Sequence, residues 1–363
     1  MSGSKDLMRR ALRLAQRGLG STRPNPPVGA VIVSGDEVVG EGWHRRAGGP
    51  HAEIEALTAA GDRARGATVY LTLEPCTRHG RTPPCAPRLI EAGIARAVIA
   101  AKDPSPEERG AGVAALTAAG IEVEFGVCQD DAAALIGGFE RWVATRRPRV
   151  TLKAALSLDG KVAAADGSSR WVSGPASRRD AHRLRGASDA VMAGIGTVLA
   201  DDPRLTCRLR GYTGAQPTRV VLDSTCRTPL DAAVLDGTAP AVIFTTSKPT
   251  TEAEHALRER GAEVVRVGTR DGRVDVGNVL DVLGERGMLE VLVEGGPTVA
   301  GELVDRGLVD RFVFYLAPKL LGHASLDALA GLVVPNIADA RELTITSVRR
   351  LGEDVRIEGK PRT

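Results

Sequence analysis

The sequence has no long hydrophobic run, few aromatic residues and almost no net charge. None of its 363 residues falls in an apolar run near the ~18 residues typical of a membrane-spanning helix, so we expect a soluble protein. Aromatic residues make up 3%, too few for a base-stacking surface. The net charge of +3 favours a local anion site over a nucleic-acid-coating surface. We expect small-molecule ligands, and neither a nucleic acid nor a membrane as partner.

Cysteine is also scarce, with five residues in the chain. An odd, unevenly spaced set does not match a small disulfide framework, so metal binding or burial is the better interpretation. The N-terminal stretch 4–18 places Leu7, Ala11 and Leu14 at helical spacing and lacks the apolar core of a signal peptide. We therefore expect a cytoplasmic protein.

Strands and helices alternate along the whole chain, whose length favours about two α/β domains. The pattern predicts strands at 28–33, 67–73, 96–101, 121–127, 150–161, 189–196, 218–224, 240–246, 262–267 and 289–296. It predicts helices at 51–61, 85–94, 112–120, 177–186 and 298–307. The basic, proline-containing stretch 144–150 marks the boundary, which predicts domains at 1–145 and 146–363.

The first candidate site combines His51, Glu53, Cys76 and Cys85. One histidine and two cysteines are the ligands of a catalytic zinc that keeps one position open, and a glutamate two residues after the histidine acts as general acid and base in zinc deaminases. Pro50 is expected to open a helix whose first turn carries His51, and Cys85 begins the next helix. Eight residues separate the two cysteines, whereas the deaminase signature has two.

Two plainer interpretations of these residues stay open. The cysteines could be buried, unreactive thiols. They could also ligate a structural zinc, which normally has four protein ligands, and His79 could supply the fourth.

The segments 24–33, 40–53 and 72–85 resemble the deaminase half of the bifunctional riboflavin-biosynthesis deaminase/reductases, including its long loop between the cysteines. The resemblance implies a cytidine-deaminase-like three-layer domain that deaminates a diaminopyrimidinone carrying a phosphoribosylamino group. It implies that His51, Cys76 and Cys85 bind zinc and that Glu53 moves protons.

The same resemblance implies that Asn25 and His44 contact the substrate and that Arg78 and Arg81 are suited to its phosphate, because guanidinium groups match phosphate oxygens. The chain departs from many relatives in having Arg78 in place of histidine and Ala30 in place of cysteine. Neither departure removes a zinc ligand.

The second candidate site lies at 289–307, where a strand, a glycine turn and a helix follow one another. Main-chain N–H groups from Gly295 to Val299 at the helix start predict an anion site suited to a pyrophosphate. The dinucleotide-binding fingerprint is absent, because 194–199 begins Gly-x-Gly but has no third glycine.

Six segments of the second half resemble motifs of the same family's reductase domain and follow one another in the same order: 152–161, 168–174, 181–186, 193–208, 220–224 and 293–298. The resemblance implies a dihydrofolate-reductase-like fold that uses NADPH. By position, the residues implied for the cofactor are Ala155, Trp171, Thr197, Asp201, Ser224, Gly296, Pro297, Thr298, Val299, Ala300, Gly301 and Glu302. Those implied for the substrate are Ser169, Arg185, Leu205, Arg208 and Glu294, with the two arginines available for its phosphate.

The implied reaction opens the ribose to a Schiff base and delivers hydride to its C1′. A proton donor is then expected, and Lys153, Asp201 and Glu294 are the candidates. An ion pair within the site is the alternative role for Lys153 and Asp201. Cys128, Cys207 and Cys226 show no pairing pattern.

Three other functions stay open at this point. They are an RNA or nucleoside deaminase with an appended α/β domain, a zinc-stabilised nucleotide-binding regulator without enzymatic activity, and an enzyme with only one active half. The near-neutral charge and the long loop between the cysteines disfavour the first. We also expect a homo-oligomer.

Overall fold

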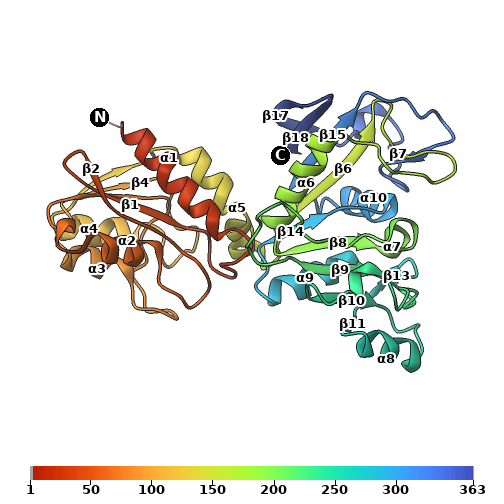
Figure 1. Ribbon diagram of the computed structural model, residues 1–363, viewed down its shortest axis with the longest axis horizontal. Helices are drawn as coiled ribbons and strands as arrows, with labels where there is room; N and C mark the ends of the chain where they lie inside the picture. Colours follow the sequence, from red (N-terminus) through yellow and green to blue (C-terminus); the bar gives the residue numbers. More distant parts are fainter. Residues whose placement is uncertain (1–2, 363) are drawn as a thin grey trace. The chain divides into compact units, whose positions relative to one another are not determined.

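The computed structural model describes residues 3–362 and shows two compact units that divide between Arg146 and Arg147 (Figure 1). Each unit has its own sheet and its own hydrophobic core. In the described residues, no helix is long and apolar enough to cross a membrane.

The first unit is built on a five-stranded sheet of order β2-β1-β3-β4-β5. Its strands are β1 (Gly29–Ser34), β2 (Glu37–Trp43), β3 (Thr68–Leu71), β4 (Arg96–Ile99) and β5 (Glu122–Phe125). Its helices are α1 (Ser4–Ala15), α2 (Ala52–Ala60), α3 (Cys85–Glu91), α4 (Ala111–Ala118) and α5 (Gln129–Thr145), with short 3₁₀ helices η1 (Gln16–Gly18) and η2 (Gly61–Ala64).

The side chains of β1 show why this unit has three layers. Ala30 and Ile32 pack in one cluster with residues of α2, α3 and α4, whereas Val31 and Val33 pack in another with residues of α1 and α5. Successive side chains of a strand point to opposite faces, so the run of apolar residues at 28–33 buries both faces of the sheet. Helices therefore cover both sides.

The second unit contains a nine-stranded sheet of order β11-β10-β9-β8-β14-β6-β15-β18-β17 among the described residues. Its strands are β6 (Arg149–Ser157), β8 (Ala190–Gly194), β9 (Thr218–Leu222), β10 (Ala241–Thr245), β11 (Glu263–Arg266), β14 (Glu290–Val293), β15 (Arg311–Ala317), β17 (Leu343–Leu351) and β18 (Asp354–Pro361). Two small ribbons pair β7 (Lys161–Ala163) with β16 (Leu326–Asp327) and β12 (Thr269–Arg270) with β13 (Arg273–Val274).

The helices of this unit are α6 (Pro175–Gly186), α7 (Ile195–Asp201), α8 (Thr251–Glu259), α9 (Val276–Glu285) and α10 (Pro297–Asp305), with 3₁₀ helices η3 (Ala233–Leu235) and η4 (Ile337–Asp339). In the order given above, the strands from β11 through β15 run parallel to one another. Strand β18 pairs antiparallel with β15, and β17 pairs antiparallel with β18. In parallel α/β sheets, ligands bind outside the carboxyl ends of the strands. The segments that follow β8, β9 and β14 therefore position the second candidate site.

Several elements have no counterpart in the sequence-based predictions. These are β2 and α5 in the first unit, and α7 to α9 together with the C-terminal strands β15, β17 and β18 in the second. The predicted α/β alternation therefore describes β1, β3, β4 and β5 of the first sheet and the strands from β11 to β6, in sheet order, of the second, and it omits β2 at an edge of the first sheet and β15, β18 and β17 at an edge of the second.

Candidate active sites

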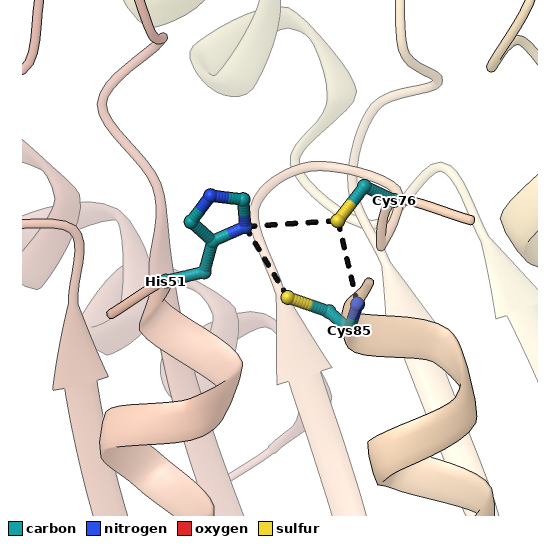
Figure 2. A group of neighbouring side chains, drawn as sticks. All are labelled: His51, Cys76 and Cys85. Carbon is teal, nitrogen blue, oxygen red and sulfur yellow. Dashed lines mark hydrogen bonds between the residues drawn. The ribbon is translucent and has the colours of Figure 1, made fainter. Parts of the chain in front are cut away.

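Three side chains from separate segments converge in the first unit (Figure 2). His51 lies immediately before α2, Cys76 lies in the loop after β3, and Cys85 is the first residue of α3. The predicted helix start is therefore corrected by one residue, because His51 has an extended backbone (φ −74°, ψ 163°) and the helix begins at Ala52.

The distances in this cluster fit a tetrahedral zinc site. Nδ1 of His51 lies 3.6 Å from Sγ of Cys76 and 3.3 Å from Sγ of Cys85, and all three ligand atoms lie within 4.8 Å of one another. Nitrogen and sulfur ligands at ordinary zinc distances in a tetrahedron are about 3.5 Å apart. His79 is not in the cluster, its ring being exposed with Nδ1 beside the Gly80 carbonyl.

The electrostatics of the cluster favour a thiolate. The hydrogen bond from the Cys85 thiol, aided by His51, outweighs burial and lowers the pKa of Cys76 to about 5. The same contact and burial raise the pKa of Cys85. The main-chain N–H of Cys85 at the start of α3 also donates to Sγ of Cys76, at 3.3 Å. A thiolate is the form of cysteine that binds zinc, so the donor set suits this metal.

Glu53 lies in the first turn of α2 and is 3% exposed. Burial raises the pKa of its carboxyl group to about 7, although the charge of His51 acts in the opposite direction. A carboxyl group with a pKa near the working pH can both accept and return a proton, which is the property a general acid and base needs.

Asn25 and His44 lie together beside the cluster. The His44 ring meets the His51 ring edge to face, with centroids 5.1 Å apart. Nδ1 of His44 lies 3.0 Å from the Pro50 carbonyl, so this nitrogen carries the proton and Nε2 accepts a hydrogen bond from the Asn25 amide at 3.1 Å. Burial lowers the pKa of His44. Because both nitrogens are engaged, the histidine fixes the direction of the Asn25 side chain.

The loop between the cysteines contributes a residue that the sequence did not indicate. Oγ1 of Thr82 lies 3.1 Å from Nε2 of His51, the nitrogen that faces away from the sulfurs. Such contacts orient a ligating histidine, and no local motif marks them in a sequence. Arg78 and Arg81 are exposed on the same loop, and neither guanidinium forms a hydrogen bond or ion pair within residues 3–362.

The second unit has a buried charged cluster after β14. Glu294 is 5% exposed and accepts hydrogen bonds from Nε and Nη2 of Arg185 at 2.5 and 2.8 Å, while Nζ of Lys153 lies 3.8 Å away. Burial alone would raise the pKa of Glu294, but the charges of Arg185 and Lys153 hold it at about 2. Burial lowers the pKa of Lys153. The guanidinium group of Arg185, which we expected to be available for the substrate phosphate, therefore donates two hydrogen bonds to Glu294.

The charges of this cluster also act on His182, a residue that was not predicted from the sequence. Its Nδ1 accepts a hydrogen bond from the main-chain N–H of Arg208 at 3.2 Å, and Nη1 of Arg208 lies 3.4 Å from Oγ1 of Thr206. Burial and the charges of Arg185 and Arg208 lower the pKa of His182 to about 4, so its ring stays neutral and able to accept. Arg208 itself is exposed.

The glycine turn after β14 lies against the segment that follows β8. Gly295 has φ +145°, and a Cβ there would lie 3.0 Å from Oγ1 of Thr197. Gly296 precedes α10 with φ +79°, and Pro297 is the first residue of that helix. The predicted cofactor residues Thr197, Gly296 and Val299 are therefore neighbours.

The rest of the predicted cofactor turn faces other parts of the protein. Ala300 is buried in the core, a Cβ at Gly301 would lie 2.2 Å from the Ala330 carbonyl, and Glu302 pairs with Arg306 at 3.1 Å. Ser224 follows β9, and its hydroxyl accepts a hydrogen bond from the main-chain N–H of Val274 at 3.0 Å.

Asp201 ends α7 and is held by the loop before α6. It accepts a hydrogen bond from the Ser169 hydroxyl at 2.9 Å and lies 4.0 Å from Nε of Arg170. Lys153 and Asp201 thus each form an ion pair, but with different partners. Trp171 is 62% exposed and lies under the guanidinium of Arg178.

Two predicted residues can contact a ligand only in a restricted way. The Leu205 side chain is buried in the core and its backbone has φ +51°, an uncommon conformation for a bulky residue, so only its main chain is available to a ligand. Ala155 lies in β6, two residues after Lys153.

Comparisons with known proteins agree with this geometry. Residues 1–101 match the cytidine and deoxycytidylate deaminase zinc-binding region, and residues 148–357 match the RibD C-terminal domain. The chain is 42% identical to the riboflavin biosynthesis protein RibD of Aquifex aeolicus, over 97% of this chain and 96% of that protein. The chain belongs to the RibD family.

Solved structures of the RibD family extend the match to the fold. Acinetobacter baumannii RibD superposes with a TM-score of 0.88 at 39% identity, covering 99% of both chains. A diaminohydroxyphosphoribosylaminopyrimidine deaminase/5-amino-6-(5-phosphoribosylamino)uracil reductase from Thermotoga maritima superposes with a TM-score of 0.87 at 36% identity, covering 99% of this chain and 98% of that one.

Membership in the RibD family confirms the predicted fold class, a cytidine-deaminase-like domain followed by a dihydrofolate-reductase-like domain. It also confirms the bifunctional deaminase and reductase activities in riboflavin biosynthesis, with zinc in the deaminase region and NADPH implied for the reductase domain. An unrelated RNA deaminase or a regulator without activity does not account for a match over nearly the whole chain.

Proposed function

We propose that the unit at 1–145 deaminates the diaminopyrimidinone that carries a phosphoribosylamino group, and that the unit at 146–363 reduces the ribosyl group of the product with NADPH. The observation that carries the proposal is the buried Glu53 carboxyl group, with a pKa of about 7, beside the cluster of His51, Cys76 and Cys85. Binding chemistry alone has no use for a proton carrier at that place.

In the deaminase unit, a bound zinc supplies the Lewis acidity that makes water nucleophilic at neutral pH. Glu53 would take a proton from the attacking water as its oxygen adds to the ring carbon, and would pass that proton to the ring nitrogen. It would then take the second proton from the added hydroxyl group and deliver it to the leaving amine, which departs as ammonia while the C=O bond forms. Asn25, held by His44, binds the pyrimidine. Arg78 and Arg81, which are exposed on the loop between the cysteines, would bind the phosphate.

In the reductase unit, bound NADPH would supply the hydride that reduces C1′ of the ring-opened ribose. The nitrogen on C1′ needs a proton as hydride adds. Glu294, with its pKa held at about 2, is ionised at neutral pH and cannot donate it, whereas burial lowers the pKa of Lys153 and makes it the better acid. We therefore assign the proton transfer to Lys153, with Glu294 as its counter-ion.

We assign the remaining roles from the resemblance to the RibD family. Gly296 to Val299, Thr197 and Ser224 would bind the cofactor phosphates and ribose, and Ala155, Trp171 and Asp201 its remaining part. Ser169, Leu205 and Arg208 would bind the substrate. The protein would act in the cytoplasm as a homo-oligomer, on small molecules.

The experiment that tests the first half uses Glu53→Gln with zinc retained. We expect ammonia release to fall by about 10²- to 10⁴-fold, the usual effect of removing a general acid and base, while zinc content stays at that of the wild type. NADPH oxidation with the deaminated pyrimidine supplied should be unchanged, because Glu53 lies in the other unit. Full deaminase activity in this variant would remove Glu53 from the mechanism.

A further inference from the structure

The chain around Cys76 is tied to a second segment, residues 103–113. The Glu74 carboxylate, 4% exposed, accepts hydrogen bonds from the main-chain N–H groups of Asp103 at 3.2 Å, Gly110 at 2.9 Å and Val113 at 3.0 Å. Glu74 lies two residues before Cys76 in the sequence. One buried carboxylate therefore fixes both ends of the 103–113 segment beside the zinc ligand.

Glu108, in the middle of that segment, reaches back to the residues on the other side of Cys76. Its Oε2 accepts hydrogen bonds from the main-chain N–H and from the hydroxyl of Thr77, both at 2.8 Å, and its Oε1 accepts one from the main-chain N–H of Arg78 at 3.1 Å. Both carboxylate oxygens are thus used on two consecutive residues that directly follow the ligand.

The contact between the two segments is close. A Cβ at Gly112 would lie 2.2 Å from the Pro75 carbonyl oxygen, so the start of α4 lies directly against the residue before Cys76. The Cys76 carbonyl in turn accepts hydrogen bonds from the main-chain N–H groups of Cys85 and Ala86, both at 3.1 Å. A shift at Cys76 would therefore also displace the start of α3, which carries the other thiol.

We propose that Glu108 is a positioning residue of the zinc site, which holds Thr77 and Arg78 so that Cys76 keeps its place relative to His51 and Cys85. The inference rests on the proposed zinc-dependent deaminase function and adds a residue to it. Groups that orient metal ligands from outside the ligand set commonly affect metal affinity or activity by about 10- to 100-fold when they are removed.

Glu108 also holds the part of the loop that we assign to the substrate phosphate. Because its carboxylate bonds the main-chain N–H of Arg78, it also fixes the backbone from which that exposed guanidinium extends. Loss of the hydrogen bonds to Glu108 should therefore raise the KM for the phosphorylated substrate and also weaken zinc binding. A merely structural role elsewhere in the unit would not change both quantities together.

The test compares Glu108→Ala and Glu108→Gln in the full-length, zinc-loaded protein, with Glu107→Ala as the matched control. Glu107 is exposed, and within residues 3–362 its side chain has no hydrogen bond or ion pair. The readout is the rate at which zinc passes to a chromogenic chelator, measured without substrate. We expect about tenfold faster release from Glu108→Ala and no change from Glu107→Ala.

Glu108→Gln keeps one acceptor oxygen and replaces the other with an amide nitrogen, which cannot accept a hydrogen bond from the main-chain N–H of Thr77 or of Arg78. We expect an intermediate rate, about fivefold faster than that of the wild type, as for the loss of one hydrogen bond. The KM for the phosphorylated substrate should rise in the same order across the variants, while NADPH oxidation with deaminated substrate stays constant.

Release rates within twofold of the wild type in both Glu108 variants would overturn the proposal. If Glu108→Ala does not accumulate as folded protein, an unchanged rate in Glu108→Gln alone overturns it. A wild-type protein that binds no zinc would instead contradict the proposed deaminase function, so the two failures are distinguishable.

Discussion

Replacing Glu294 with glutamine should destabilise the second unit strongly, because it leaves two largely buried cations, Lys153 and Arg185, without their counter-ion. Glu294 is 5% exposed, Arg185 donates two hydrogen bonds to it at 2.5 and 2.8 Å, and Lys153 lies 3.8 Å away. Removing one partner of a buried ion pair costs about 3–5 kcal/mol. For a unit of this size the loss corresponds to a fall in Tm of about 10 °C.

The control for this substitution is Glu263→Gln, which removes a surface pair in which an arginine likewise donates two hydrogen bonds to one carboxylate. Arg286 donates to Glu263 at 2.6 and 2.8 Å, but the Glu263 side chain is 55% exposed. Exposed pairs contribute about 0.2–1 kcal/mol, so we expect a shift in Tm of at most ~4 °C. Differential scanning calorimetry of the full chain measures both. Equal, small shifts in the two variants would refute the reasoning from burial.

The pH dependence of the unfolding free energy provides a second test of this prediction. The pKa of Glu294 is lowered from an ordinary value of 4.5 to about 2, so the ionised form stabilises the folded unit. This stabilisation is complete above pH ~4.5 and is lost as the pH falls toward 2. The difference in unfolding free energy between the wild type and Glu294→Gln should therefore be constant from pH 7 to pH 5 and then narrow. A constant difference down to pH 3 would contradict the assigned pKa.

Two further predictions address the metal and the cofactor. Removing zinc with a chelator should abolish ammonia release and leave NADPH oxidation of the deaminated substrate intact, and added zinc should restore the first activity; loss of both activities would contradict two independent sites. Gly295→Ala should raise the KM for NADPH by about tenfold or more, since its φ of +145° is unfavourable for alanine and the new Cβ would lie 3.0 Å from Oγ1 of Thr197. An unchanged KM would remove this turn from the cofactor site.

The sequence was sufficient to predict the zinc cluster because each ligand type has a local signal. Cys85 follows two prolines at a helix start, and His51 precedes a helix whose first turn carries Glu53. The resemblance to RibD proteins then explained the long spacing between the cysteines. The continuous apolar run of β1 likewise made a sheet covered on both faces predictable.

Other parts could not be predicted because their partners are distant in sequence. Arg185 and Glu294 are 109 residues apart, and Glu108 is 31 residues from Thr77, so no spacing rule joins them. The pairing also shows that Arg185, which we expected to be available for a phosphate, donates two hydrogen bonds to a carboxylate. Helix α5 was not predicted because Gly137 and Gly138, at its centre, lower the helix propensity of this segment.

The measurement that tests the central claim most directly follows both activities of the wild-type, zinc-loaded protein in one reaction with the phosphoribosylamino-diaminopyrimidinone and NADPH. The account predicts that ammonia appears first and that one NADPH is oxidised per ammonia released, with no oxidation when zinc has been removed. NADPH oxidation that proceeds without ammonia release, or ammonia release that is never followed by oxidation, would contradict a single chain that performs the two steps in this order.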